Sequence, residues 1–183
     1  PVQHMIWAEI DALIAGDTRF ALIDETLSRD ALLALTAGAD AYLSLHRSEG
    51  WGFGMIEAMN LGVPVLATAY SGNMDFCTPD TCWLVDYTLK ELEPMDYIFV
   101  RPGQKWAEPD VACAARQMRA MKDNPELCAK RAQAARHKVQ TEFSEEAIGK
   151  RYGARMQQIL RDLQNGKITR ISVYMAGANS IKS

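Results

Sequence analysis

Short apolar runs alternate with helix-forming stretches through the first half of the chain, and this alternation is the strongest constraint on its fold. The apolar runs lie at residues 19–23, 41–45, 63–68 and 83–85, and each has about the length of one strand. Stretches with helix start and stop signals separate them. Strands that alternate with helices at this spacing indicate βαβ units. The sequence therefore predicts an α/β fold, with a Rossmann-like parallel sheet and flanking helices.

Helix signals extend the expected fold on both sides of these strands. Helices are expected at residues 3–14 and 28–37, from the glycine-rich loop to Leu61, and briefly up to Phe76. Residues 86–105 contain two prolines and a glycine and are expected to form a long loop. Three helices are then expected at 109–122, 124–141 and 144–163. The domain should span 1–165, and the tail 166–183 has no pattern that places it.

Composition and charge limit the kinds of function that the chain can have. With 183 residues, 48% of them hydrophobic, the chain is long and apolar enough to bury a core. Its 20 basic and 23 acidic residues give a net charge of -3, which argues against nucleic acid as a partner. No apolar run approaches the roughly 18 residues of a transmembrane helix, and we expect no signal peptide. The four cysteines have no metal-binding spacing, so we expect reduced thiols and a cytoplasmic protein.

The residue types that can carry chemistry gather in residues 46–59, after a predicted strand. Glu49 and Glu57 have seven residues between them, and three of those are glycines. Backbone amides at the helix start, near Trp51 to Phe53, suit an anion such as a diphosphate. A carboxylate accepts two hydrogen bonds and suits a vicinal diol. A nucleotide-sugar offers both groups, although a glycine-rich turn without a ligand explains the same residues equally well.

This stretch resembles the E-x7-E motif of the retaining family-four glycosyltransferases, the glycosyl transferases group 1, which have the GT-B fold. Glu49 and Glu57 are the two glutamates of that motif. The resemblance covers roughly residues 18–163. Within the family, the chain resembles bacterial polysaccharide-assembly members. Further matching segments are Ala39–Leu45, Glu49–Gly52, Glu57–Met59, Gly62–Val65, Ser71–Gly72 and Trp106–Asp110.

The resemblance implies a role for each motif residue. Glu49 is implied to face the donor sugar as the catalytic residue, and Glu57 to hold the nucleotide ribose. The residues implied to line the donor are Gly50, Trp51, Gly52 and Phe53. His46 and Arg47 precede the loop and are candidates for the diphosphate, because Arg in particular pairs well with phosphate. As strand-exit residues they could equally be ordinary surface polar groups.

The resemblance also implies what the whole enzyme would be. We expect transfer of a sugar from a nucleotide-diphosphate sugar to a glycan or lipid-linked acceptor, with retention of configuration and no metal or other cofactor. The acceptor domain and the basic diphosphate ligands have no match here. The chain, which begins at Pro1 and not at Met, is therefore expected to be the C-terminal donor-binding part of a longer enzyme. That enzyme is expected in the cytoplasm, with peripheral binding to the inner face of the membrane as a second option.

Departures from the family pattern keep a second hypothesis open. Gly54 stands where a larger residue is usual in the first helical turn, which costs roughly 1 kcal/mol of helix stability relative to Ala. Trp51 replaces phenylalanine, and Asp75 is a doubtful counterpart of a family glutamate. Together with the absent acceptor domain, Gly54 supports the alternative of a non-catalytic Rossmann-like module that binds a nucleotide or a protein.

Overall fold

The computed structural model describes residues 2–167, with side chains from residue 6 onward. It divides into two compact units, Pro1–Leu33 and Ala34–Ser183. The first unit contains α1 (Val2–Ile14), as the sequence predicts, and the start of α2 (Arg29–Ala37). Residues 168–183, which include almost all of the unplaced tail, lie outside the described residues.

The predicted strand at residues 19–23 is wrong. Residues 20–23 have no regular secondary structure, and Phe20, Leu22 and Ile23 are each about half exposed. A strand requires a neighbour that accepts and donates its backbone hydrogen bonds. Within the described residues, no strand pairs with this segment. Apolar and β-branched side chains alone therefore do not make it a strand.

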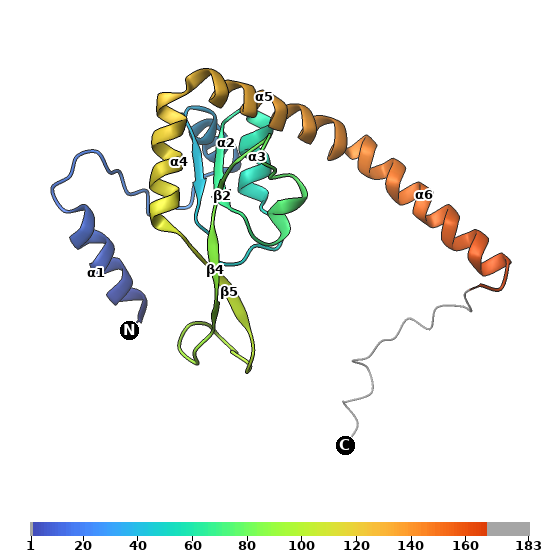
Figure 1. The fold of residues 1–183 in the computed structure, drawn as a ribbon, viewed down its shortest axis with the longest axis horizontal. Coiled ribbons are helices and arrows are strands. Elements are labelled where there is room, and N and C mark those ends of the chain that lie inside the picture. The colour runs from blue at the N-terminus through green and yellow to red at the C-terminus, as the bar shows by residue number, and fades with distance from the viewer. Residues whose placement is uncertain (1, 168–183) are drawn as a thin grey trace. The chain divides into compact units, whose positions relative to one another are not determined.

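A three-stranded parallel sheet forms the centre of the second unit (Figure 1). Its order is β1 (Tyr42–Ser44), β2 (Val65–Thr68) and β3 (Trp83–Val85). Tyr42 pairs with Val65, and Leu66 pairs with Trp83. Every residue of β2 is buried, as expected for a parallel strand that is covered on both faces. The predicted α/β class and the parallel sheet are confirmed.

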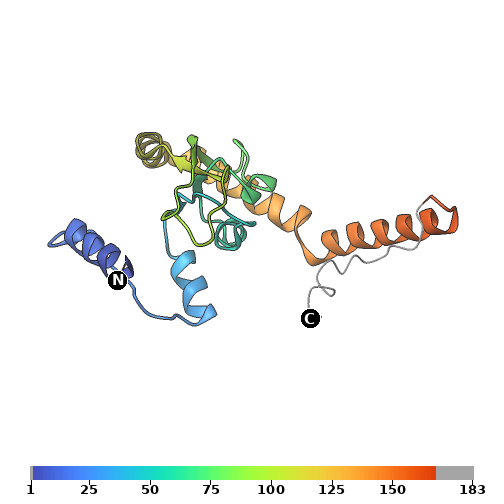
Figure 2. The same ribbon diagram turned by 90° about the horizontal axis from the view of Figure 1, so that it is seen from below.

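Helices cover both faces of this sheet. On one face α3 (Phe53–Leu61) packs against α5 (Pro125–Glu142), and their buried side chains join Val65 and Ala67 of β2. On the other face α4 (Val111–Asp123) packs on Leu66 and on β3. Figures 1 and 2 show α5 running across the direction of α4. Alternate residues of β2 thus supply two separate cores.

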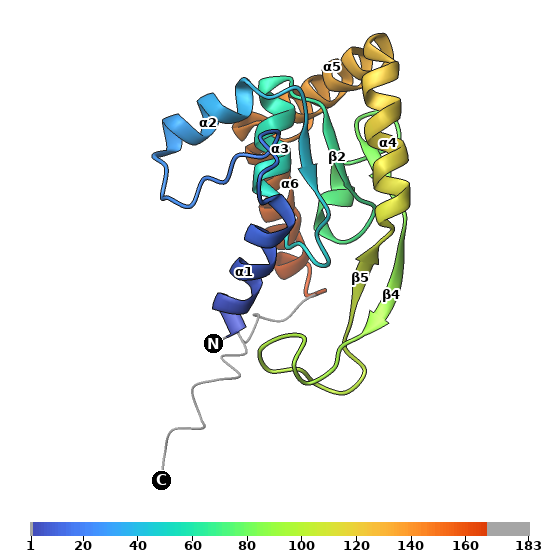
Figure 3. The ribbon, with the colours of Figure 1, turned by 90° about the vertical axis from the view of Figure 1, so that its left-hand side faces the viewer.

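The predicted long loop at 86–105 is wrong, because it contains one strand of a hairpin. Strand β4 (Tyr87–Glu91) pairs antiparallel with β5 (Lys105–Pro109). Figure 3 shows this hairpin projecting from the end of the sheet where α4 begins. All five β4 residues are exposed, and the apolar alternation is limited to Tyr87 and Leu89, which is too short to predict a strand. Pro109 ends β5, and α4 begins after Asp110, two residues later than predicted.

The remaining predicted helices are confirmed. A short 3-10 helix, η1, covers Gly72–Asp75, and α6 covers Glu145–Gln164 after its N-cap Ser144. No side chain of α6 is buried. Among the described residues, no helix is long and apolar enough to cross a membrane.

The N-cap of α4 offers a test of which helices belong to the cooperative core. Asp110 accepts a hydrogen bond of 2.9 Å from the Cys113 amide. Asp110→Ala should lower the free energy of unfolding by about 1 kcal/mol in urea titrations. Asp110→Asn should keep most of that contribution, because asparagine also caps helices. Ser144 caps α6 in the same way. Because α6 buries no side chain, Ser144→Ala should fray that helix without moving the urea midpoint, and equal shifts would contradict this assignment.

Candidate functional site

The motif loop is the segment between the end of β1 and the start of α3, and it contains Glu49. Gly52 is the N-cap of α3 and has a φ of 97°, which only glycine adopts without strain. A Cβ there would also lie 2.6 Å from the Met55 methyl group. The loop therefore turns sharply into the helix, and the first amides of α3 face the carboxyl end of the sheet. This is the place where parallel sheets bind ligands.

Glu49 is held by its backbone. Its carbonyl oxygen accepts hydrogen bonds from the Ser71 hydroxyl at 2.6 Å and from the Gly72 amide at 3.2 Å. Its carboxylate accepts a longer bond of 3.4 Å from the Trp51 amide. The half-buried side chain thus stays beside the first amides of the loop, within the stretch that the sequence predicts to bind a donor.

The Trp51 side chain anchors the loop in an aromatic cluster. Its ring lies 5.4 Å from Phe53, 5.5 Å from Phe76 and 5.7 Å from Phe143, measured between centroids. Such edge-to-face and tilted contacts stabilise beyond the area they bury. The tryptophan that replaces the usual phenylalanine therefore contacts Phe143 at the end of α5. Phe53, beside it in the cluster, is 71% exposed.

Tyr42 belongs to the site and was missed by sequence reasoning. A Cβ at Gly54 would lie 2.3 Å from the Tyr42 hydroxyl oxygen, so the glycine makes room for the phenol. Burial, and then the negative charges of Glu49 and Glu57, raise the pKa of Tyr42. The phenol therefore lies within electrostatic reach of both motif carboxylates. The signal for it was Gly54 itself, which is costly in a helix unless a neighbour needs the space.

His46 joins the motif loop to the turn after β2. Its Nδ1 lies 3.1 Å from the Ser44 hydroxyl, and its Nε2 lies 3.0 Å from the Tyr70 carbonyl oxygen and 3.2 Å from Asn73 Oδ1. Both ring nitrogens thus have protein partners. A diphosphate contact from His46 stays a prediction, and it requires one of these hydrogen bonds to be exchanged.

Arg47 is paired with the β4–β5 hairpin. Its guanidinium donates two bonds of 2.9 Å to the Glu108 carboxylate, and it lies 4.8 Å from the Trp106 ring centroid. The hydrogen bonds of this pair raise the pKa of Arg47 and lower the pKa of Glu108. The Ala107 amide also bonds the Arg47 carbonyl oxygen at 2.9 Å. Its predicted diphosphate contact likewise stays a prediction, and only the guanidinium N–H groups that do not bond Glu108 could make it without breaking this pair.

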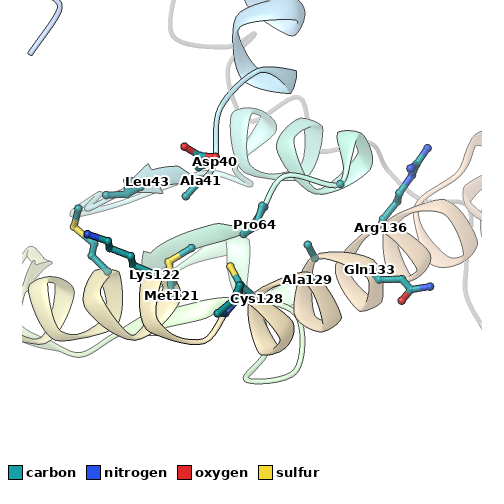
Figure 4. Close-up of a pocket in the computed structure, with 14 residues that line it drawn as sticks. Asp40, Ala41, Leu43, Pro64, Met121, Lys122, Cys128, Ala129, Gln133 and Arg136 are labelled. Atoms are coloured by element: carbon teal, nitrogen blue, oxygen red, sulfur yellow. The ribbon is translucent and has the colours of Figure 1, made fainter. Parts of the chain in front are cut away.

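A separate cavity of about 880 Å³ opens beside β1, between α4 and α5 (Figure 4). Its lining is mainly apolar, and Met121 and Cys128 face Ala41 and Pro64 across it. None of the predicted site residues lines it. The lining also holds four polar side chains, Asp40, Lys122, Gln133 and Arg136. The motif loop remains the candidate site because the two motif glutamates and the first amides of α3 lie there.

Comparison with known proteins agrees with the motif. Residues 23–91 match the family described as Glycosyl transferases group 1. The matched segment contains both motif glutamates and all three strands of the parallel sheet, and it supports glycosyl transfer in general. None of the curated proteins is significantly similar to the chain in sequence.

Two solved structures have the same fold. Sucrose-phosphate synthase from Thermosynechococcus elongatus superposes with a TM-score of 0.64 at 22% identity, over 86% of this chain and 34% of its own. The C-terminal domain of the glycosyl transferase group 1 family protein LpcC from Francisella tularensis superposes with a TM-score of 0.60 at 17% identity, over 79% of this chain and 66% of its own. The chain thus spans about a third of the synthase.

The packing of Tyr42 against Gly54 can be measured with a double-mutant cycle. Gly54→Ala should destabilise the chain even though alanine is the better helix former, because its methyl group meets the phenol. Tyr42→Phe removes the closest atom and should restore part of that loss in the double variant. Urea unfolding of the four proteins gives the coupling. If Gly54→Ala is stabilising, the phenol does not occupy this space.

Proposed function

We propose that this chain is the donor-binding part of a retaining, nucleotide-sugar-dependent glycosyltransferase. It would transfer a hexose or similar sugar to a glycan or lipid-linked acceptor in polysaccharide biosynthesis, in the cytoplasm. The observation that carries the proposal is the placement of Glu49 and Glu57. One lies at the exit of a parallel strand and the other within the following helix, on either side of the first amides of α3. The family match supports the reaction class.

Each part of the donor has a chemical counterpart in this arrangement. The amides at the start of α3 would hold the diphosphate, because helix N-termini favour anions. Glu57 would accept hydrogen bonds from the ribose hydroxyls, and Glu49 would face the transferred sugar. The bond between the anomeric carbon and the diphosphate would break while the acceptor oxygen bonds on the same face. The leaving diphosphate would be stabilised electrostatically, without a metal ion.

The acceptor side of the cleft would come from chain outside these 183 residues. A single α/β domain provides one wall of a cleft, and the chain spans about a third of the synthase it resembles in fold. The 183-residue chain alone should bind a nucleotide-sugar weakly, with a dissociation constant of about 1 mM or more. It should show no transfer in a radiolabelled-sugar assay. Measurable turnover by this chain alone would contradict the division of roles.

Substitutions of the two motif glutamates should have different effects in the full-length enzyme. Glu57→Gln removes the charge that accepts bonds from the ribose, and such bonds are worth about 1.5–3 kcal/mol. Titration calorimetry should show roughly ten- to a hundredfold weaker binding of both the nucleotide-sugar and the bare nucleoside diphosphate. Glu49→Gln should leave affinity for the nucleoside diphosphate almost unchanged while turnover falls, because its partner is the sugar.

Glu126→Gln, in the exposed first turn of α5, is the matched control and should change neither quantity. The opposite pattern in the two motif variants would mean that their roles are reversed. If neither variant changes binding or rate, the loop is only a turn of the fold. If the enzyme binds nucleotide but transfers no sugar, the non-catalytic module is the better description.

A further inference from the structure

Ser71 has a backbone conformation that a residue with a side chain rarely adopts. Its φ is 81° and its ψ is -155°, a region that is almost restricted to glycine. Among the described residues, Phe99 is the one other non-glycine residue with a positive φ. A glycine would fit this position without strain, so the serine side chain must be kept for what it contacts. Strained backbone of this kind is concentrated at functional sites.

The Ser71 side chain bonds both backbone polar groups of Glu49. Its hydroxyl donates to the Glu49 carbonyl oxygen at 2.6 Å and lies 3.4 Å from the Glu49 nitrogen as an acceptor. The amide of Gly72 adds a second bond to the same carbonyl, at 3.2 Å. The backbone of Glu49 is thus held by a turn that lies 22 positions later in the sequence. Glu49 is the residue that the proposed function places against the sugar.

The surrounding packing holds the strained turn in place. A Cβ at Gly72 would lie 2.0 Å from the Gly50 carbonyl oxygen, so the two backbones are in direct contact. Asn73 is fully buried, and its side chain donates to the Thr68 carbonyl oxygen at 3.0 Å and contacts His46. The turn cannot relax without breaking these buried contacts, which is the condition under which strain persists.

We propose that Ser71 is a positioning residue for Glu49. Its hydroxyl sets where the Glu49 backbone lies and therefore where the carboxylate points relative to the amides of α3. The proposal rests on the proposed function, which gives Glu49 its place at the sugar. A misplaced reacting group loses much of its rate advantage, so the hydroxyl should affect turnover more than affinity.

Two substitutions separate the hydroxyl from the strain. Ser71→Gly removes the hydroxyl and relieves the strain, so the melting temperature should stay the same or rise. Ser71→Ala removes the hydroxyl and keeps the strain, so the melting temperature should fall. In the full-length enzyme both variants should lower kcat by roughly ten- to a hundredfold, with KM for the nucleotide-sugar changed less than about threefold.

Phe99→Gly is the matched control, because it relieves the other positive φ far along the hairpin connection and should leave kcat unchanged. Amide hydrogen exchange in the 183-residue chain gives a readout that needs no activity. Exchange at Gly72 should become faster in both Ser71 variants and stay unchanged in the control.

The outcomes distinguish this proposal from the proposed function. If the unmodified enzyme transfers sugar and Ser71→Gly does so with the same kcat, the positioning role is overturned and the proposed function stands. If the enzyme transfers no sugar but Gly72 exchange responds as expected, the contact with Glu49 holds and the proposed function fails. Unchanged exchange at Gly72 in both Ser71 variants would overturn the contact itself.

Discussion

The rest of the site depends on a backbone-to-backbone contact between the motif loop and the turn after β2. Gly72 lies so close to the Gly50 carbonyl that no side chain fits at position 72, and its amide bonds Glu49. The contact is possible because β1 and β2 are parallel neighbours, whose following loops emerge at one edge of the sheet. The register between β1 and the buried strand β2 therefore decides where a carboxylate is held.

Much of this arrangement could be predicted from the sequence, and the failures have physical causes. Residues 63–68 read as a strand because they form a short apolar run, and the helices carried their own start and stop signals. The strand predicted at residues 19–23 was wrong because a strand forms only where another strand pairs with it. Apolar side chains alone do not supply that pairing. The hairpin was missed because β4 is exposed at every residue. The bonds from Ser71 to Glu49 cross 22 positions, and no local pattern reports them.

Gly54 shows how a departure from a family pattern changes its meaning once the structure is known. In sequence it weakens the first turn of a helix and suggests a site that has lost its chemistry. In the structure it is the space into which the Tyr42 hydroxyl fits, close enough to both motif carboxylates for their charges to raise its pKa. The absence of a side chain at Gly54 leaves the space that the Tyr42 phenol fills. Gly54 therefore no longer supports the non-catalytic alternative.

The hydrogen bonds of His46 and Arg47 limit how a diphosphate could be bound here. His46 uses both ring nitrogens to join two loops, and Arg47 is committed to Glu108 and to the Trp106 face. Moving either one would loosen the turn that holds Glu49 or the hairpin that follows β3. The proposed site thus offers a diphosphate mainly backbone amides and the dipole of α3, which attract an anion more weakly than a paired arginine does. Tight donor binding would then require positive charge in addition to these amides.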